Sequence, residues 1–358
     1  MSNAQKITAE ILAGADVCIN GDRPWDLQVK NDKFYNRVLS GGSLALGESY
    51  LDGWWEVAKL DQFFAKVLAV GLDKKVRPSF ALGAAWLKTK LLNPQRRAKA
   101  FEIGERHYDI GNDLYQAMLD GRMTYTCGYW KDLERIPANL DAAQEAKLDL
   151  VCKKIGLKAG DKVLDIGCGW GSFAKFAAEK YGATIVGVTV SKQQAELAKQ
   201  LCAGWPIDIR LTDYREVNEQ FDHIISLGMF EHVGEQNYRT YMEVVSRCLK
   251  DDGIFLLHTI GGNTSVSSTD PWIGKYIFPN SMLPSIAQIA KSIEGLFVME
   301  DWHNFSADYN TTLRAWMANV DTAWSTLKAK YGDRFYRMWR YYLMASAGSF
   351  QARKNQLW

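Results

Sequence analysis

Between residues 162 and 258 the sequence repeats one unit, a short run of apolar and β-branched residues followed by a stretch with helical character. The runs that we expect to form strands are residues 162–166, 184–190, 207–211, 223–227 and 254–258. Strands that alternate with helices pair in parallel, because the chain must cross back over the sheet before the next strand begins. The alternation therefore predicts an α/β fold whose ligands bind beyond the carboxyl ends of the strands.

The first strand candidate leads directly into a glycine-rich loop, in the sequence KVLDIGCGWG. Gly167, Gly169 and Gly171 remove the Cβ atoms where a helix could begin, so a ligand can approach the backbone. A dinucleotide-binding loop would have the spacing G-x-G-x-x-G and an acid about 20 residues further on. Here the spacing is G-x-G-x-G and the second strand candidate ends in Val-Thr-Val-Ser, which disfavours a nicotinamide cofactor. Asp165 would repel a pyrophosphate and favours a positively charged ligand such as S-adenosylmethionine.

Polar side chains follow the other strand candidates at the points where these end. They are Thr189, Ser191 and Gln194 after the second, Asp213 and Tyr214 after the third, Glu231 and His232 after the fourth, and His258 at the fifth. Because the carboxyl ends of parallel strands meet at one edge of a sheet, we expect these side chains to surround one site.

The composition is ordinary for a globular protein and argues against several classes. Of the 358 residues, 47% are hydrophobic and 23% are charged, and a formal net charge of only +2 does not indicate a nucleic-acid partner. The six cysteines show neither a CxxC pair nor a metal-ligand spacing, so we expect free thiols and no metal. There is no membrane-length apolar run and no secretory leader, which predicts a cytoplasmic protein.

The most unevenly charged part of the chain is residues 74–99, with eight Lys or Arg and no Asp or Glu. Apolar residues at helical spacing are interleaved with these cations, as in helices that lie on anionic lipid surfaces. The same pattern also occurs in ordinary surface helices with a linker, and it leaves both interpretations open. Asn93 and Pro94 mark the best domain break, which divides the chain into residues 1–93 and 94–358.

Several strings occur in a fixed order along the chain: HYDIGNDLY, YTCGYW, LDIGCGWG, VTVSKQQ, GMFEHVG, LLHTIG, DPWIGKYIFPN and MEDWHNFSADYNTTL. Together they resemble the cyclopropane-fatty-acyl-phospholipid synthase family over nearly the whole chain, whereas related mycolic-acid cyclopropane synthases share only the catalytic half. The resemblance implies a Rossmann-like S-adenosylmethionine-dependent methyltransferase domain, residues 94–358, and a smaller N-terminal lipid- or membrane-binding domain, residues 1–93. Family members usually continue past the equivalent of Trp358.

The resemblance also implies a reaction and its partners. A methylene group from S-adenosyl-L-methionine would be added across the cis double bond of an acyl chain in a membrane phospholipid. The enzyme would be a homodimer, peripherally associated with the inner face of the membrane. Methyl transfer to the alkene would leave a carbocation, and a bound bicarbonate ion would then remove a proton so that the ring can close. A weak oxyanion suits this step, because a strong nucleophile there would itself be methylated.

Motif by motif, the resemblance implies two sets of site residues. The bicarbonate pocket would consist of Cys127, Glu231, His258, the backbone of Ile260, and Tyr309. The cofactor residues would be Tyr125, Thr126, Leu164, Asp165, Gly167, Gly169, Gly171, Ser172, Thr189, Gln194, Asp213 and Tyr214. With no acid at the second strand tip, we expect the Gln194 amide to bind the ribose hydroxyls. Tyr214 would stack on adenine, and Asp213 would accept a hydrogen bond from its amino group.

Aromatic residues are expected to stabilise the carbocation, because ring faces attract cations. The candidates are Tyr129, Trp130, Phe230, Trp272, Tyr276, Phe278 and Tyr309. His107 and Tyr108 could cover the sulfonium or the acyl tail, or cap the helix that follows. Two other functions remain open: methylation of another lipid alkene or of a small molecule, and lipid binding without catalysis.

Overall fold

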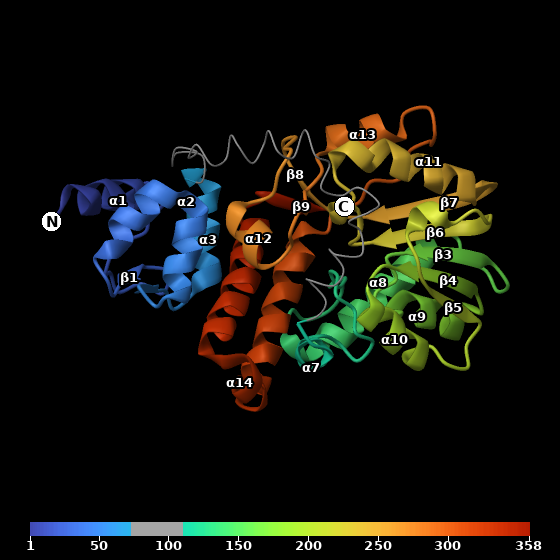
Figure 1. The fold of residues 1–358 in the computed structure, drawn as a ribbon, viewed down its shortest axis with the longest axis horizontal. Helices are drawn as coiled ribbons and strands as arrows, with labels where there is room; N and C mark the ends of the chain where they lie inside the picture. Colours follow the sequence, from blue (N-terminus) through green and yellow to red (C-terminus); the bar gives the residue numbers. More distant parts are fainter. Residues whose placement is uncertain (73–109) are drawn as a thin grey trace.

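The structure is a computed structural model that describes residues 1–72 and 110–358 (Figure 1). The predicted domain boundary at Asn93 and Pro94, the basic segment 74–99, and His107 and Tyr108 lie outside the described residues.

A five-stranded parallel sheet forms the centre of the larger part, in the order β5-β4-β3-β6-β7. Its strands are β3 (Lys162–Ile166), β4 (Thr184–Thr189), β5 (Ile207–Leu211), β6 (Phe221–Leu227) and β7 (Leu249–His258). The predicted strands are confirmed, although β7 begins five residues earlier than the apolar run suggested, at Leu249 instead of Ile254. The early part of β7 is polar and exposed, so hydrophobicity gives no signal for it.

Helices cover both faces of the sheet (Figure 1). They are α8 (Leu140–Lys154), α9 (Ser172–Tyr181), α10 (Lys192–Leu201), α11 (Tyr238–Cys248) and α13 (Ile286–Ile293). Successive residues of β3 face opposite sides, so Val163 packs with α8 and α9 while Leu164 packs with α11. Short 3-10 turns after the strands are η3 (Tyr214–Glu216), η4 (Phe230–His232) and η5 (Glu235–Asn237), and η2 (Pro137–Asn139) precedes α8.

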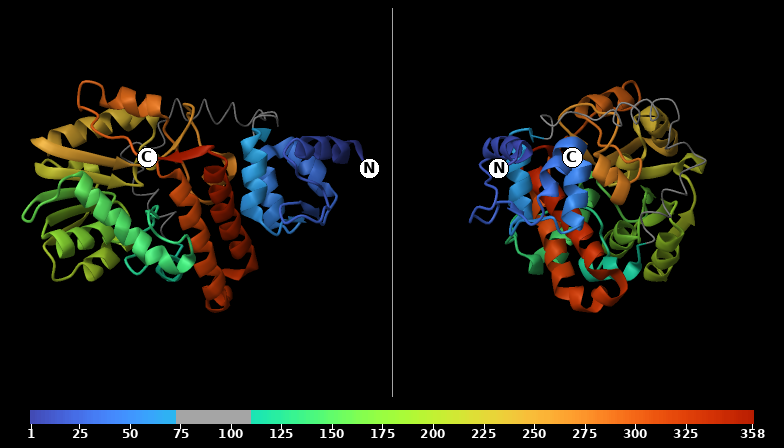
Figure 2. Two further views of the ribbon diagram at one scale, coloured as in Figure 1. Left: turned by 180° about the vertical axis from the view of Figure 1, so that it is seen from behind. Right: turned by 60° about the vertical axis from the view of Figure 1, so that its left-hand side comes forward.

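A second group of elements stands beside the sheet. Its centre is α14 (Ser306–Gln351), which reverses at Gly332, where φ is 76° and ψ is 164°, into two antiparallel arms (Figure 2). Around it lie α7 (Asn112–Met118) and α12 (Pro271–Tyr276). After the second arm, β9 (Asn355–Leu357) pairs antiparallel with β8 (Ile260–Gly262). This pairing brings the last residues next to the end of β7.

The N-terminal part contains α1 (Asn3–Ala13), β1 (Gln28–Val29), α2 (Lys33–Leu51), β2 (Trp55–Glu56) and α3 (Leu60–Ala69). It packs against α14, and one hydrophobic core runs from Trp55 and Phe63 to Tyr341. Gly348 allows the close approach of α14 and α3, because a Cβ there would lie 2.6 Å from Cβ of Phe64. None of the described helices is long and apolar enough to cross a membrane.

Candidate active site

The three glycines of the loop after β3 all have positive φ angles, of 85°, 56° and 83° in chain order. A Cβ on Gly167 would lie 2.7 Å from Met229, and one on Gly171 would lie 2.5 Å from the Cys202 sulfur. Around Gly169, in contrast, there is open space for 4 Å. The outer glycines are therefore needed for close packing, and Gly169 leaves room beside the backbone for a ligand.

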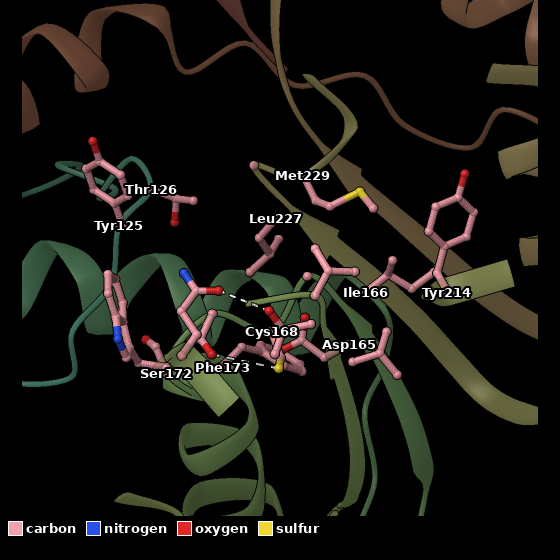
Figure 3. A pocket seen from close by; sticks show the side chains of 18 of the residues that line it. Tyr125, Thr126, Asp165, Ile166, Cys168, Ser172, Phe173, Tyr214, Leu227 and Met229 are labelled. Carbon is pink, nitrogen blue, oxygen red and sulfur yellow. Dashed lines mark hydrogen bonds between the residues drawn. The ribbon is translucent and has the colours of Figure 1, made fainter. Parts of the chain in front are cut away.

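A first cavity, of about 170 Å³, opens over this loop at the carboxyl edge of the sheet. Figure 3 shows side chains from several strand tips converging on it, with Tyr125 and Thr126 on one side and Tyr214 on the other. All of the predicted cofactor residues line it except Leu164, which packs in the core below, and Gly171.

Asp165, at the floor of this cavity, is only 2% exposed. Its carboxylate accepts no hydrogen bond from the described residues. Burial raises its pKa from 3.8 to about 7, against the opposing influence of the Lys147 cation. A buried carboxylate that lacks a hydrogen-bond donor and has a raised pKa favours a cationic ligand group that can donate hydrogen bonds to it.

Gln194 and Asp213 are already partly engaged by protein groups. Thr189 Oγ1 donates to Gln194 Oε1 at 3.0 Å, which orients the amide so that Nε2 is the group left to donate. Asp213 accepts hydrogen bonds from the backbone N–H and the guanidinium of Arg215, at 2.9 and 3.0 Å. Tyr214 is buried, with its ring 5.0 Å from that of Tyr241.

A second cavity, of about 410 Å³, lies next to the first. Tyr125, Thr126, Gly228 and His232 line both cavities and so mark their junction. The second cavity is otherwise lined by Glu231, His258, Ile260 and Tyr309 and by the aromatic side chains of Phe278, Tyr342 and Phe350. The structure thus brings together four of the five residues predicted for the bicarbonate pocket.

Two buried polar atoms in the lining of the second cavity have no partner among the described residues: Glu231 Oε2 and His258 Nδ1. The other carboxylate oxygen of Glu231 accepts a hydrogen bond from the backbone N–H of Ile260 at 2.7 Å. Burial raises the pKa of Glu231 to about 7 and lowers that of His258 to about 3, so the imidazole is neutral. Buried polar atoms usually have a hydrogen-bond partner, so these two atoms are available to bind a polar group in the second cavity.

Cys127 lies outside the lining of both cavities. Its thiol donates to the Gly128 carbonyl at 3.1 Å and lies 3.8 Å from Thr312 Oγ1. Burial raises the pKa of the thiol well above its usual range, so it is protonated and can serve as a donor.

Of the aromatic residues proposed to stabilise positive charge, Phe278 and Tyr309 line the second cavity and the other five do not. Phe230 stacks on Tyr238 at 4.2 Å, and Trp272 packs on Tyr341 at 4.4 Å. Sequence reasoning missed other lining residues, among them Tyr342, Phe350 and Lys147. Tyr342, Ser346 and Phe350 have the i, i+4, i+8 spacing of one helical face, which was a usable signal. Within the described ranges, no cluster of His, Cys, Asp and Glu could hold a metal ion.

Comparison with known proteins gives sequence relatives over the whole chain. Residues 95–358 match the family described as mycolic acid cyclopropane synthetase. The sequence is 52% identical to cyclopropane-fatty-acyl-phospholipid synthase of Escherichia coli (strain K12), over 99% of this chain and 92% of that protein. It is 33% identical to tuberculostearic acid methyltransferase UfaA1 of Mycobacterium tuberculosis, over 90% of this chain and 79% of that protein.

Solved structures resemble the larger part of the molecule. The cyclopropane synthase MmaA2 from Mycobacterium tuberculosis has a TM-score of 0.67 and 28% identity, covering 72% of this chain and 95% of its own. Mycolic acid cyclopropane synthase CmaA1, solved in complex with SAH and CTAB, has a TM-score of 0.66 and 31% identity with the same coverage.

Proposed function

The chain belongs to the mycolic acid cyclopropane synthetase family and has its Rossmann-like methyltransferase fold, and from this premise we propose that it makes cyclopropane fatty acids. In the proposed reaction, a methylene group passes from S-adenosyl-L-methionine to the cis double bond of an unsaturated acyl chain in a phospholipid. The observation that carries the proposal is the pair of joined cavities, one with a buried acid and a glycine loop, the other aromatic with two unpaired polar atoms.

The residues of the first cavity fit S-adenosylmethionine, which supplies an electrophilic methyl group when bound. The Asp165 carboxylate, which lacks a donor within the described residues, binds the ammonium group. Gly169 leaves the space that the ligand needs beside the backbone. Gln194 Nε2 donates to a ribose oxygen, and Tyr214 with Asp213 recognises the adenine.

The second cavity fits an apolar chain with a double bond. The walls around Phe278, Tyr309 and Tyr342 exclude water and hold the alkene in line with the methyl donor, which is worth up to about 7–11 kcal/mol. The ring faces stabilise the positive charge left on the acyl chain, by about 2 kcal/mol when desolvated.

Glu231 and His258 fit a small oxyanion that carries one hydroxyl group, as bicarbonate does. Glu231 Oε2 accepts a hydrogen bond from the hydroxyl group and so fixes the orientation of the ion, while His258 and Tyr309 donate to its oxygens. A bicarbonate ion held there supplies a weak base. The Ile260 N–H, which donates to Glu231, positions the carboxylate. A direct contribution from Cys127 requires its thiol to rotate away from the Gly128 carbonyl.

The likeness to tuberculostearic acid methyltransferase supports a second candidate function, methyl transfer to a lipid alkene without ring closure. Mass spectrometry and proton NMR of unsaturated phospholipid vesicles, after incubation with the enzyme and S-adenosylmethionine, distinguish the two. Cyclopropane formation adds one CH₂ and removes the olefinic protons. Addition of one CH₂ with an olefin retained would establish the second function instead, and unchanged lipids with no adenosylhomocysteine would exclude both.

We also propose that the enzyme acts at the inner surface of the cytoplasmic membrane, because its substrate double bond lies inside a bilayer. The family resemblance is the basis for proposing that it does so as a homodimer. Each Lys or Arg near an anionic surface contributes about 1 kcal/mol to binding. Charge reversal at Lys88, Lys90, Arg96 and Arg97 is therefore expected to weaken co-sedimentation with anionic vesicles and to leave cofactor affinity intact. Equal vesicle binding by the variant and the native protein would exclude this segment as the contact.

A further inference from the structure

A buried lysine lines the first cavity, and the proposed reaction has no use for it. Lys147, in the middle of α8, is only 3% exposed and lines the first cavity. Lysines are almost never buried to this degree unless they are paired, because the ammonium group loses its hydration. The ammonium group donates a hydrogen bond to Thr126 Oγ1 at 2.7 Å.

The segment that Lys147 contacts is held at several points. Gln144, one helical turn earlier on α8, donates from Nε2 to the Thr126 carbonyl at 2.7 Å. Asp120 accepts from the backbone N–H and the hydroxyl of Thr124, at 2.7 and 3.1 Å. Residues 124–126 are therefore fixed from both sides by buried side chains, and Lys147 binds the hydroxyl of Thr126, a residue that lines both cavities.

Thr126 is part of the partition between the cavities. A Cβ on Gly228 would lie 2.7 Å from the Thr126 methyl group, so these two residues pack in direct contact. Thr126 and Gly228 each line the first and the second cavity. A movement of Thr126 would therefore change the shape of the junction across which a methyl group must pass.

Lys147 also sets the charge balance around the junction. The titratable groups that act on it are Asp120 from the loop before the segment, Cys127 at its end and Asp165 from β3. Burial lowers the pKa of Lys147 to about 8, and these groups oppose that change. The lysine in turn lowers the pKa of Asp165 and of His258 on β7.

We propose that Lys147 is a positioning residue that fixes Thr126 at the junction of the cavities. Because Lys147 and Asp165 are both buried and line the same cavity, the lysine cation also supports the Asp165 carboxylate in its ionised form. This proposal rests on the cofactor site proposed above. If Asp165 binds an ammonium group, cofactor affinity must fall as pH drops and the carboxylate is protonated. Removing the Lys147 cation raises the pKa of Asp165 further, so the fall must begin at a higher pH.

The test measures the dissociation constant of adenosylhomocysteine by calorimetry between pH 6 and 9, for the native protein and three variants. Lys147→Met is expected to bind adenosylhomocysteine about tenfold more weakly than the native protein at pH 7 and to regain affinity as pH rises. The midpoint of its affinity change should lie at a higher pH than in the native protein. Lys147→Gln keeps a donor for Thr126 without the charge, so it should show the displaced midpoint with turnover closer to native at high pH. Lys153→Met, on the exposed side of the same helix, is the matched control and should behave like the native protein.

Several outcomes decide the proposal. A folded Lys147→Met protein with native affinity and midpoint would overturn it. A uniform loss of affinity at all pH values, without displacement of the midpoint, would leave Lys147 with a structural role only and would refute the electrostatic part. If Lys147→Met does not fold, Lys147→Gln carries the same measurement. Failure of the native protein to bind adenosylhomocysteine at any pH would contradict the proposed function instead, whatever the variants do.

Discussion

The two cavities contain the same kind of buried acid but are built in different ways. Asp165 in the first and Glu231 in the second both have a pKa raised by burial to about 7. The first cavity is formed mainly by the tips of consecutive strands, around a loop that the backbone itself shapes. The second takes its walls from the region after β7 and from both arms of α14. We therefore expect changes in the first cavity to affect cofactor affinity and changes in the second to affect turnover.

The largest effect is expected for Gly169→Val in the first cavity. A branched side chain would occupy the open space beside the loop and would be strained at a φ of 56°. Binding of adenosylhomocysteine, measured by calorimetry, should be lost. Gly160→Val is the matched control, because Gly160 also has a positive φ, of 89°, and open space around it, but lies outside both cavities. Native affinity in a folded Gly169→Val protein would mean that the ligand binds elsewhere.

The converse change in the second cavity is Glu231→Gln. It should leave cofactor affinity intact and lower kcat by about 100-fold or more, since an amide in place of the carboxylate cannot orient the base in the same way. Single-turnover rates with vesicle substrate measure this, and Glu235→Gln, at an exposed position nearby, is the control. Removal of bicarbonate from the buffer should slow the native enzyme, and its addition should restore the rate. A near-native rate in Glu231→Gln would contradict the role assigned to this residue.

The raised pKa of Glu231 also predicts how stability depends on pH. Its pKa moves from 4.5 to about 7 on folding, so the folded state retains a proton that the unfolded state releases. The corresponding stability is present below pH 4.5 and is lost as pH rises through 7, a change of about 3 kcal/mol. The free energy of unfolding can be measured with urea at pH 4 and at pH 8. The difference between these two values should be about 3 kcal/mol smaller in Glu231→Gln than in the native protein. The same difference in both proteins would mean that the Glu231 carboxylate is ionised in the folded protein without a cost in stability.

The smallest effect is expected for Gln194→Ala, which tests the ribose contact of the first cavity. Loss of one hydrogen bond to a desolvated hydroxyl should weaken cofactor binding by about 1–3 kcal/mol, with kcat at saturation nearly unchanged. Gln200→Ala, exposed on the same helix, is the control. A fall in kcat of Gln194→Ala without a change in cofactor affinity would contradict the assignment of cofactor binding to the first cavity and of turnover to the second.

The same contrast explains how far the sequence alone could predict this molecule. The sheet and the first cavity follow from local signals, because strands such as β3 end in the residues that line the site. The second cavity depends on where α14 reverses, and the single residue responsible, Gly332, carries no signal about which wall the returning arm will form. The helical spacing of Tyr342 and Phe350 indicates a shared face, but the packing of α14 decides which cavity that face lines. Lys147 could be placed only after the packing of α8 was known, because tertiary contacts bring it to the site.

The pairing of β8 with β9 has a consequence for the order in which the molecule is assembled. Thr259 and Trp358 exchange two backbone hydrogen bonds, at 2.9 and 3.0 Å, across nearly a hundred residues of intervening chain. A contact of such long sequence separation forms late, because its loop-closure entropy must be overcome first. During synthesis, the sheet and the glycine loop can therefore mature while α14 is still being made. The second cavity, whose lining includes Asn355 and Leu357, is completed only after these residues have left the ribosome, so a nascent chain forms the first cavity before the second.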